Sequence, residues 1–178
     1  VGKDVYAVSD GRISKVDFEN KTLVKTALPA VRNATSDGRF IATIPVGDNA
    51  IITYDSALNE KETYGSKSAK DKWFDSPEKV FSENGNVAVW DKANARVQFF
   101  FNDGTYKKLS VSKNATSVAV NTTHTAYTDG KKVYVVNNAD YSLREINTDK
   151  NVGAISLTND AVAIYDKNSK AIYTAGLS

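Results

Sequence analysis

The stretch Ser117–Ile146, with the sequence SVAVNTTHTAYTDGKKVYVVNNADYSLREI, shows most clearly how the chain folds. Short runs rich in valine and tyrosine alternate in it with polar turns. The pair Asp129-Gly130 supplies the positive φ angles that a tight hairpin requires. We therefore predict four consecutive strands, which span residues 117–120, 125–128, 132–137 and 143–146. Strands joined by connections this short pair as one small antiparallel sheet.

The same pattern recurs along the chain. A second unit predicts strands at residues 34–36, 40–44, 49–54 and 61–64. Successive units carry an aspartate at the end of a strand, at intervals of 38, 43, 38 and 37 residues. Six positions after each aspartate lies an apolar residue of the next strand. Three positions before four of the five aspartates lies an alanine. The five aspartates are Asp10, Asp48, Asp91, Asp129 and Asp166.

The repeats divide one domain, residues 1–178, into five units. The approximate bounds of these units are 1–29, 30–66, 76–112, 113–149 and 150–178. A polar loop at 66–75 separates the second unit from the third, and its Trp73 and Phe74 are expected to pack back onto the domain. The first unit lacks its first strand, and the last unit lacks its fourth.

Four short antiparallel strands about every 40 residues are typical of the blades of a β-propeller. We therefore predict an all-β, propeller-like array of about five four-stranded blades, in which the terminal blades are incomplete. A β-sandwich is the alternative, because sandwiches also show turns at intervals of roughly 8–12 residues. A sandwich, however, gives no reason for the aspartates to recur at a constant spacing.

Three segments resemble the YVTN and NHL-like repeats of bacterial and archaeal β-propellers, which are related to WD40 repeats. These segments are Asp37–Ala42, Ile51–Asp55 and Gly130–Asn137. The resemblance covers most of the chain and implies the propeller fold. It does not carry over the functional residues of WD40 proteins, because the chain has one Trp-Asp pair, Trp90-Asp91, without the Gly-His pair that accompanies it in that family.

The composition excludes several classes of function. Of 178 residues, 23 are lysine or arginine and 21 are aspartate or glutamate, so the basic excess of a dedicated nucleic-acid binder is missing. The absence of cysteine excludes disulfides and thiol nucleophiles, and a single histidine, His124, excludes a multi-histidine metal site. No apolar run approaches the roughly 18 residues of a membrane helix, so no membrane insertion is expected. The lack of cysteine and methionine and the start at Val1 favour a processed chain or an excised domain from an extracellular, cell-surface or virion-surface protein.

No catalytic, cofactor-binding or metal-binding residue is predicted, since the common nucleophile, phosphate-loop and zinc motifs are missing from the sequence. The five repeated aspartates could form a ring of carboxylates for Ca²⁺, which takes about 6–8 oxygen ligands. We interpret them instead as structural turn residues whose carboxylates accept backbone N–H bonds. His124 is interpreted as an exposed turn histidine. Phe99–Phe101 places at least one aromatic residue on each face of its strand. Trp90 and the nine tyrosines are candidate stacking platforms for a glycan or a peptide, although packing between blades is the simpler explanation.

The repeats and the missing catalytic set together predict a non-catalytic binding or scaffolding module that acts in adhesion, recognition or assembly. Its expected partner is a protein or a glycan. Two alternatives remain open. One is a Ca²⁺-dependent propeller enzyme of the lactonase or lyase kind, and the other is a structural subunit that associates with itself by exchanging terminal strands. Four N-x-S/T sequons are candidate glycosylation sites, at Asn20, Asn33, Asn114 and Asn121.

Overall fold

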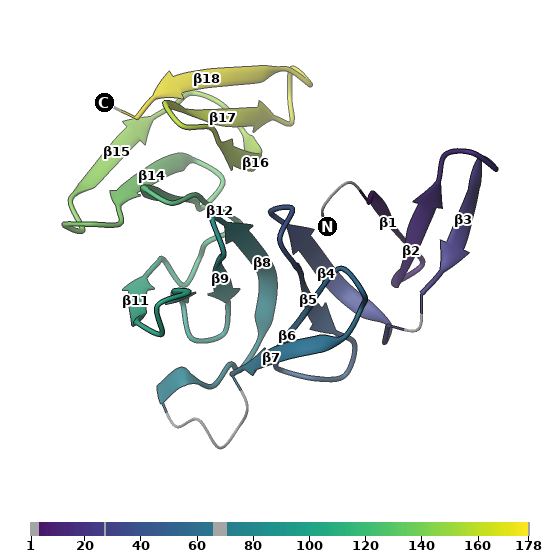
Figure 1. Cartoon of the computed structure of the whole chain (residues 1–178). Helices are drawn as coiled ribbons and strands as arrows, with labels where there is room; N and C mark the ends of the chain where they lie inside the picture. Colours follow the sequence, from purple (N-terminus) through teal and green to yellow (C-terminus); the bar gives the residue numbers. More distant parts are fainter. Residues whose placement is uncertain (1–3, 27, 66–70, 178) are drawn as a thin grey trace. The chain divides into compact units, whose positions relative to one another are not determined.

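The computed structural model describes residues 4–26, 28–65 and 71–177, which form five small antiparallel sheets (Figure 1). In every sheet the strands lie side by side in chain order. Sheet A contains β1 (Tyr6–Ser9), β2 (Arg12–Asp17) and β3 (Thr22–Lys25). Sheet B contains β4 (Val31–Ser36), β5 (Ile41–Pro45), β6 (Ile51–Tyr54) and β7 (Glu60–Tyr64).

Sheets C, D and E follow the same plan. Sheet C contains β8 (Pro77–Glu83), β9 (Asn86–Asp91), β10 (Arg96–Phe100) and β11 (Tyr106–Ser110). Sheet D contains β12 (Ser117–Val120), β13 (His124–Thr128), β14 (Lys132–Asn137) and β15 (Leu143–Asn147). Sheet E contains β16 (Val152–Leu157), β17 (Ala161–Asp166) and β18 (Ile172–Gly176).

This architecture confirms the predicted all-β fold of small blade-like sheets and is not the alternative of two facing layers. In sheet D, β12 and β14 have the bounds expected from the sequence. Its β13 begins one residue earlier, at His124, and its β15 ends one residue later, at Asn147. Within the part of the chain that the structure describes, sheets A and E have three strands each, so the terminal blades are incomplete as predicted.

The chain divides into two compact units. The first comprises residues 1–94 and 98–107, and the second comprises residues 95–97 and 108–178. Sheets A and B belong to the first unit and sheets D and E to the second, while strands of sheet C contribute to both. Among the described residues, no helix is long and apolar enough to span a membrane.

Two apolar clusters hold the first unit together. Ile13 of β2 packs with Ile41 and Tyr54 of sheet B. The opposite face of sheet B contributes Ile51, which packs in a second cluster with Val89 of β9. Because successive residues of a strand point to opposite faces, sheet B can bury one face against each of its neighbours.

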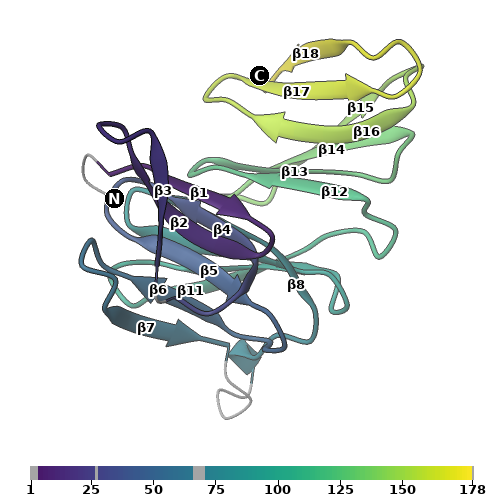
Figure 2. The ribbon, with the colours of Figure 1, turned by 90° about the vertical axis from the view of Figure 1, so that its right-hand side faces the viewer.

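The second unit has the same construction, and Figure 2 shows β16–β18 lying alongside β12–β15. Ala126 and Val135 of sheet D pack with Val162 and Ile164 of sheet E. Val162 and Ala126 are completely buried. Burial of these small and β-branched side chains between two sheets supplies the main stabilisation of the unit.

Polar contacts also join neighbouring sheets at equivalent places in the two units. In the first unit, Asn33 Oδ1 in β4 accepts the backbone N–H of Val80 in β8 at 2.9 Å. In the second unit, Ser117 Oγ in β12 accepts the backbone N–H of Ile155 in β16 at 3.3 Å. In both cases a side chain on the first strand of one sheet meets the first strand of the next sheet.

The segment before β8 carries the aromatic pair of the predicted 66–75 loop, of which residues 66–70 lie outside the described residues. Phe74 is 1% exposed and packs between sheets B and C, as expected from the sequence. Trp73 is 38% exposed and therefore packs only in part. Gly65 makes room for Phe74, because a Cβ at this position would overlap the phenylalanine ring.

Candidate functional site

The five repeated aspartates all lie where the second strand of a blade ends and its connection to the third strand begins, counting sheet A as lacking its first strand. Asp91 ends β9 and is completely buried. Its carboxylate accepts the backbone N–H groups of Asp75 and Ser76, each at 3.1 Å, and the side-chain amide of Asn94 at 2.7 Å. These bonds connect the turn after β9 to the residues that precede β8.

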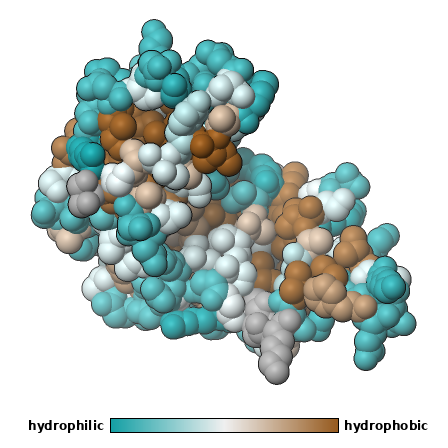
Figure 3. Space-filling view, turned by 90° about the horizontal axis from the view of Figure 1, so that it is seen from above, coloured by the Kyte–Doolittle hydropathy of each residue, from teal (hydrophilic) through white to brown (hydrophobic). Residues whose placement is uncertain are grey.

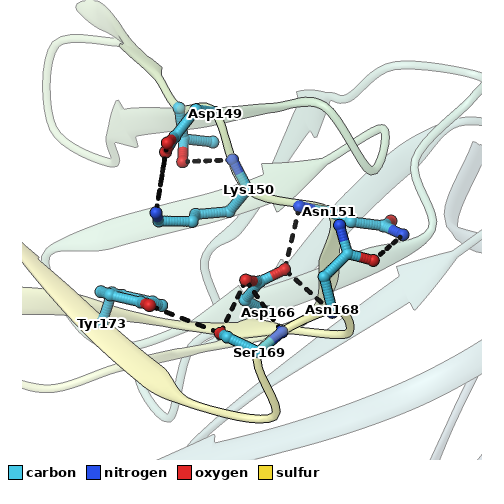
Figure 4. Close-up of polar contacts among 8 residues, drawn as sticks. Asp149, Lys150, Asn151, Asp166, Asn168, Ser169 and Tyr173 are labelled. Carbon is cyan, nitrogen blue, oxygen red and sulfur yellow. Dashed lines mark hydrogen bonds and ion pairs between the residues drawn. The ribbon is translucent and has the colours of Figure 1, made fainter.

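Asp166 has a similar arrangement at the end of β17 (Figure 4). Its carboxylate accepts the backbone N–H of Asn151, which precedes β16, at 3.1 Å and the hydroxyl of Ser169 at 2.7 Å. The bond from the Ser169 hydroxyl is the largest cause that lowers the pKa of Asp166. Beside this carboxylate, Lys150 Nζ lies 4.7 Å from the ring centre of Tyr173.

The other three aspartates make different contacts. Asp129 accepts the backbone N–H groups of Lys132 and Lys131, each at 3.0 Å, and these two bonds lower its pKa. Asp10 occupies a two-residue turn and itself has a positive φ of 51°. Asp48 lies exposed in the loop after β5. Nowhere in the described part of the chain do three aspartate, glutamate or histidine side chains gather closely enough to hold a metal ion.

The four sequons differ in how their asparagine side chains are used. Asn121 Nδ2 donates to the carbonyl of Thr158 at 2.8 Å. Asn33 accepts the bond between sheets B and C described above. Asn20 and Asn114 lie exposed, in the turn after β2 and in the loop before β12. Exposure favours Asn20 and Asn114 as attachment sites. Asn20 Nδ2 nevertheless donates to Asp17 Oδ2 at 2.9 Å, so a glycan at Asn20 or Asn121 would have to accommodate a bond that Nδ2 already makes.

The aromatic residues that stand out in the sequence are buried to different degrees. Trp90 is 4% exposed, so its ring does not offer an open face. In the run Phe99–Phe101, the first and third rings stack with centres 6.2 Å apart, while the middle ring packs between sheets B and C. His124 is half-buried at the start of β13, with Nδ1 2.8 Å from the hydroxyl of Thr123.

Sheets B and C enclose a cavity of about 500 Å³, which is the candidate functional site. Its walls come from β6 and β7 on one side and from the β10–β11 hairpin on the other. Arg39 of the β4–β5 turn, Gly85 of the β8–β9 turn and Lys72 of the segment before β8 complete the lining. The volume lies within the roughly 300–1,000 Å³ that is typical of small-molecule sites.

Aromatic rings form the inner wall of this cavity. The ring centre of Phe100 lies 4.7 Å from that of Tyr64 and 5.3 Å from that of Tyr106. The hydroxyl of Tyr106 donates to Oε1 of the buried Gln98 at 2.6 Å, which fixes the orientation of the tyrosine ring. The hydroxyl of Tyr64 donates to the carboxylate of Glu62. Burial, together with this bond, raises the pKa of Tyr64, so its hydroxyl stays protonated at neutral pH.

Three cationic side chains also line the cavity. Arg39, Lys61 and Lys72 line the cavity and are all exposed. Lys72 Nζ lies 5.1 Å from the ring centre of Tyr106. Among the described lining residues, Glu62 carries the only acidic side chain. The surplus of positive charge favours a ligand that carries negative charge.

Sequence reasoning found part of this wall and missed the rest. The sequence places an aromatic residue of Phe99–Phe101 on each face of its strand, and Phe100 does line the cavity. Arg39 and Asn102 lie in turns, within two residues of Gly38 and Gly104. Polar residues are common in such turns, so the sequence does not mark either of them as a ligand-binding residue. The signal that could have located them is the position of both turns at the same end of adjacent blades.

No protein-family model matches the sequence, and no curated protein matches it. Solved structures do. Hsv2 of Kluyveromyces lactis matches with a TM-score of 0.70 at 10% identity, over 97% of this chain and 56% of its own. A structure from a nidogen–laminin complex matches with a TM-score of 0.67 at 12% identity, over 99% of this chain and 73% of its own. The fold is a β-propeller-like array.

An enzyme is also among the propellers with this fold. Virginiamycin B lyase of Staphylococcus aureus matches with a TM-score of 0.60 at 13% identity, over 96% of this chain and 68% of its own. At such low identities the similarity shows the propeller fold alone. The chain spans little more than half the length of the Hsv2 chains that it matches.

Proposed function

We propose that the chain is a non-catalytic binding module of an extracellular or virion-surface protein that acts in recognition, adhesion or assembly. The observation that carries the proposal is the cavity between sheets B and C, which combines an aromatic wall with exposed cationic side chains. Aromatic rings and a few convergent polar groups are the usual components of a ligand site. The similar structure from a nidogen–laminin complex supports a binding role for the fold by analogy.

Binding of the labelled chain to arrays of oligosaccharides and peptides tests the proposal. Arg39→Glu reverses a charge at the cavity, and Lys113→Glu is the matched control, because Lys113 is an exposed residue of the loop before β12. We expect the array signal to be lost in Arg39→Glu and retained in Lys113→Glu. Equal binding by both variants would contradict the cavity as the site. Bound compounds should also be tested for turnover, since virginiamycin B lyase has a similar fold. Turnover of any of them would contradict a non-catalytic role.

A second candidate function is self-association, and sheet A provides the observation that favours it. Within the described residues β1 pairs with β2 alone, so its other edge is open. A groove of about 340 Å³ lies beside this edge, and its lining includes Val8 of β1 and Ile41 of β5. Val5, Val8 and Leu23 are each about half exposed, and Figure 3 shows apolar side chains gathered at the right, over β1–β3. Open edges of this kind can pair with another strand.

Sedimentation velocity over a hundredfold range of concentration tests the second candidate. If sheet A mediates association, the average mass rises with concentration in the unaltered chain. Val8→Lys places a charge in the groove beside the open edge and is expected to restore the monomer. Lys113→Glu, in the loop before β12 and outside the lining of the groove, is expected to leave association unchanged. A monomer at every concentration would contradict this function.

A further inference from the structure

We propose that the cavity between sheets B and C binds an acidic saccharide, whose carboxylate or sulfate lies beside Gly85 and whose ring lies against the aromatic wall. This inference rests on the proposed binding function and adds the chemistry of the ligand.

The first argument is the convergence of two donors beside a bare glycine. A Cβ built on Gly85 would lie 3.0 Å from Arg39 Nη1 and 3.3 Å from Asn102 Nδ2, so both groups lie directly beside this residue. The turn itself is fixed by Asp37, because its Oδ2 accepts the backbone N–H of Gly85 at 2.6 Å. A guanidinium and a carboxamide that present N–H groups to one place match the paired oxygens of a carboxylate or a sulfate.

The second argument is charge. Lys61 and Lys72 add two cations to Arg39, against the single lining carboxylate of Glu62, which already accepts the hydroxyl of Tyr64. The carboxylate of Asp103, in the nearby β10–β11 turn, accepts the backbone N–H of Thr105 at 2.8 Å and is used in that way to hold the turn. Asp37 adjoins Gly85 without lining the cavity, and its carboxylate is used by the Gly85 N–H. The three lining cations therefore exceed the one lining carboxylate.

The third argument distinguishes a saccharide from an acidic peptide. The hydroxyl of Thr63 donates to Glu60 at 2.9 Å, and the hydroxyl of Thr105 donates to Asp103 at 2.7 Å. A hydroxyl that has given its proton to the protein retains lone pairs that accept hydrogen bonds from a ligand. These two oxygens add hydrogen-bond acceptors to a lining that otherwise offers cationic and amide donors, and they suit a ligand that carries O–H donors besides its charge. The half-buried rings of Tyr64 and Tyr106 provide apolar surface for the C–H face of a sugar ring.

An array of paired acidic and neutral oligosaccharides tests the ligand class. It carries uronate-, sialate- and sulfate-bearing glycans beside their uncharged counterparts, and a pentaglutamate peptide. We expect at least one acidic glycan to bind better than its neutral partner. In titration calorimetry with that glycan, Arg39→Gln is expected to weaken binding by roughly ten- to a hundredfold, the range for hydrogen bonds to charged groups. Asn102→Asp, which adds a negative charge beside Gly85, is expected to abolish it, and Lys113→Gln to leave it unchanged.

Each negative result has a distinct meaning. If no acidic glycan binds better than its neutral partner, or if Arg39→Gln binds the acidic glycan as tightly as the unaltered chain, the saccharide assignment is wrong. If pentaglutamate alone binds and the binding depends on Arg39, the saccharide assignment is wrong while the binding function stands. If none of the probes binds and the chain converts a substrate, both proposals are wrong.

Discussion

A single glycine supports one side of the aromatic cavity. Gly65 has a φ of +78°, and a Cβ there would overlap the ring of Phe74, whereas Gly38 has a φ of +88° with nothing within 4 Å of its Cβ. We expect Gly38→Ala to lower the free energy of unfolding by about 1–2 kcal/mol through backbone strain alone. Gly65→Ala should lower it by about 1–3 kcal/mol more, because the added methyl group clashes in a packed core. Urea unfolding of the three proteins measures the difference, and equal losses would contradict the clash.

The repeated aspartates are not equivalent, and their replacement should show it. Asp91 is completely buried and accepts two backbone N–H groups, from Asp75 and Ser76. Asp91→Ala leaves these donors without their acceptor, so we expect a loss of about 2–3 kcal/mol in the free energy of unfolding. Asp129 bonds the backbone of its own half-buried turn, where water can replace the carboxylate, so Asp129→Ala should cost only about 0.5–1 kcal/mol. Similar losses for the two variants would mean that burial does not distinguish them.

At the scale of the elements, the sequence predicts the strands well. It predicts less well which residues of different sheets occupy equivalent positions. Ala42 and Ala126 are both completely buried in the second strand of their sheets. In the sequence, however, Ala42 precedes its aspartate by six residues and Ala126 precedes its aspartate by three. Two of the three residues of difference arise because Asp48 lies three residues beyond the end of β5, whereas Asp129 directly follows β13. The third arises because Ala42 lies three residues before the end of its strand and Ala126 lies two. The spacing of the repeated aspartates predicts where the hairpins lie. Only the pairing of the strands shows which residues occupy equivalent positions in different sheets.

The cavity could not be predicted because no local pattern encodes it. Its lining comes from separate segments between Arg39 and Tyr106, which only the packing of sheet B on sheet C brings together. The aromatic composition of a run such as Phe99–Phe101 is enough to predict a buried strand. The position of Asn102 beside Gly85 depends instead on the relative placement of two turns from different hairpins, which local composition does not report.

Sheet A should be less protected against hydrogen exchange than sheet C. All four residues of β3 are exposed, whereas five of the six residues of β9 are buried. Phe18, in the turn between β2 and β3, is 70% exposed. Local opening costs little where few apolar groups are buried, so amides of β2 and β3 should exchange faster than those of β9 and β10. Hydrogen exchange followed by NMR checks this, and equal protection in the two sheets would contradict it.

For the molecule as a whole, turn aspartates with a lowered pKa determine the response to acid. Each accepts hydrogen bonds from backbone or side-chain donors of its own turn, and these bonds are the largest cause of the lower pKa. They occur in every sheet or in the turns of its strands: Asp17, Asp55, Asp103, Asp129, Asp140 and Asp166. A carboxyl group whose pKa is lower in the folded state than in the unfolded state stabilises the fold above the unfolded value. That stabilisation is lost as the pH falls through the folded value.

The unfolded value is near 3.8, so the melting temperature should change little between pH 7 and pH 5 as far as these groups are concerned, and should fall as the pH drops below about 4. Replacing Asp103 and Asp166 together by asparagine removes two of the groups that take up protons on unfolding, one in each compact unit. The double variant should therefore be less stable at pH 7 and lose less of its stability on acidification. Calorimetric melting from pH 7 to pH 2 measures both slopes. The opposite outcome is a double variant that loses as much stability on acidification as the unaltered chain. It would show that repulsion among the cations, and not the loss of the turn bonds, drives the acid transition.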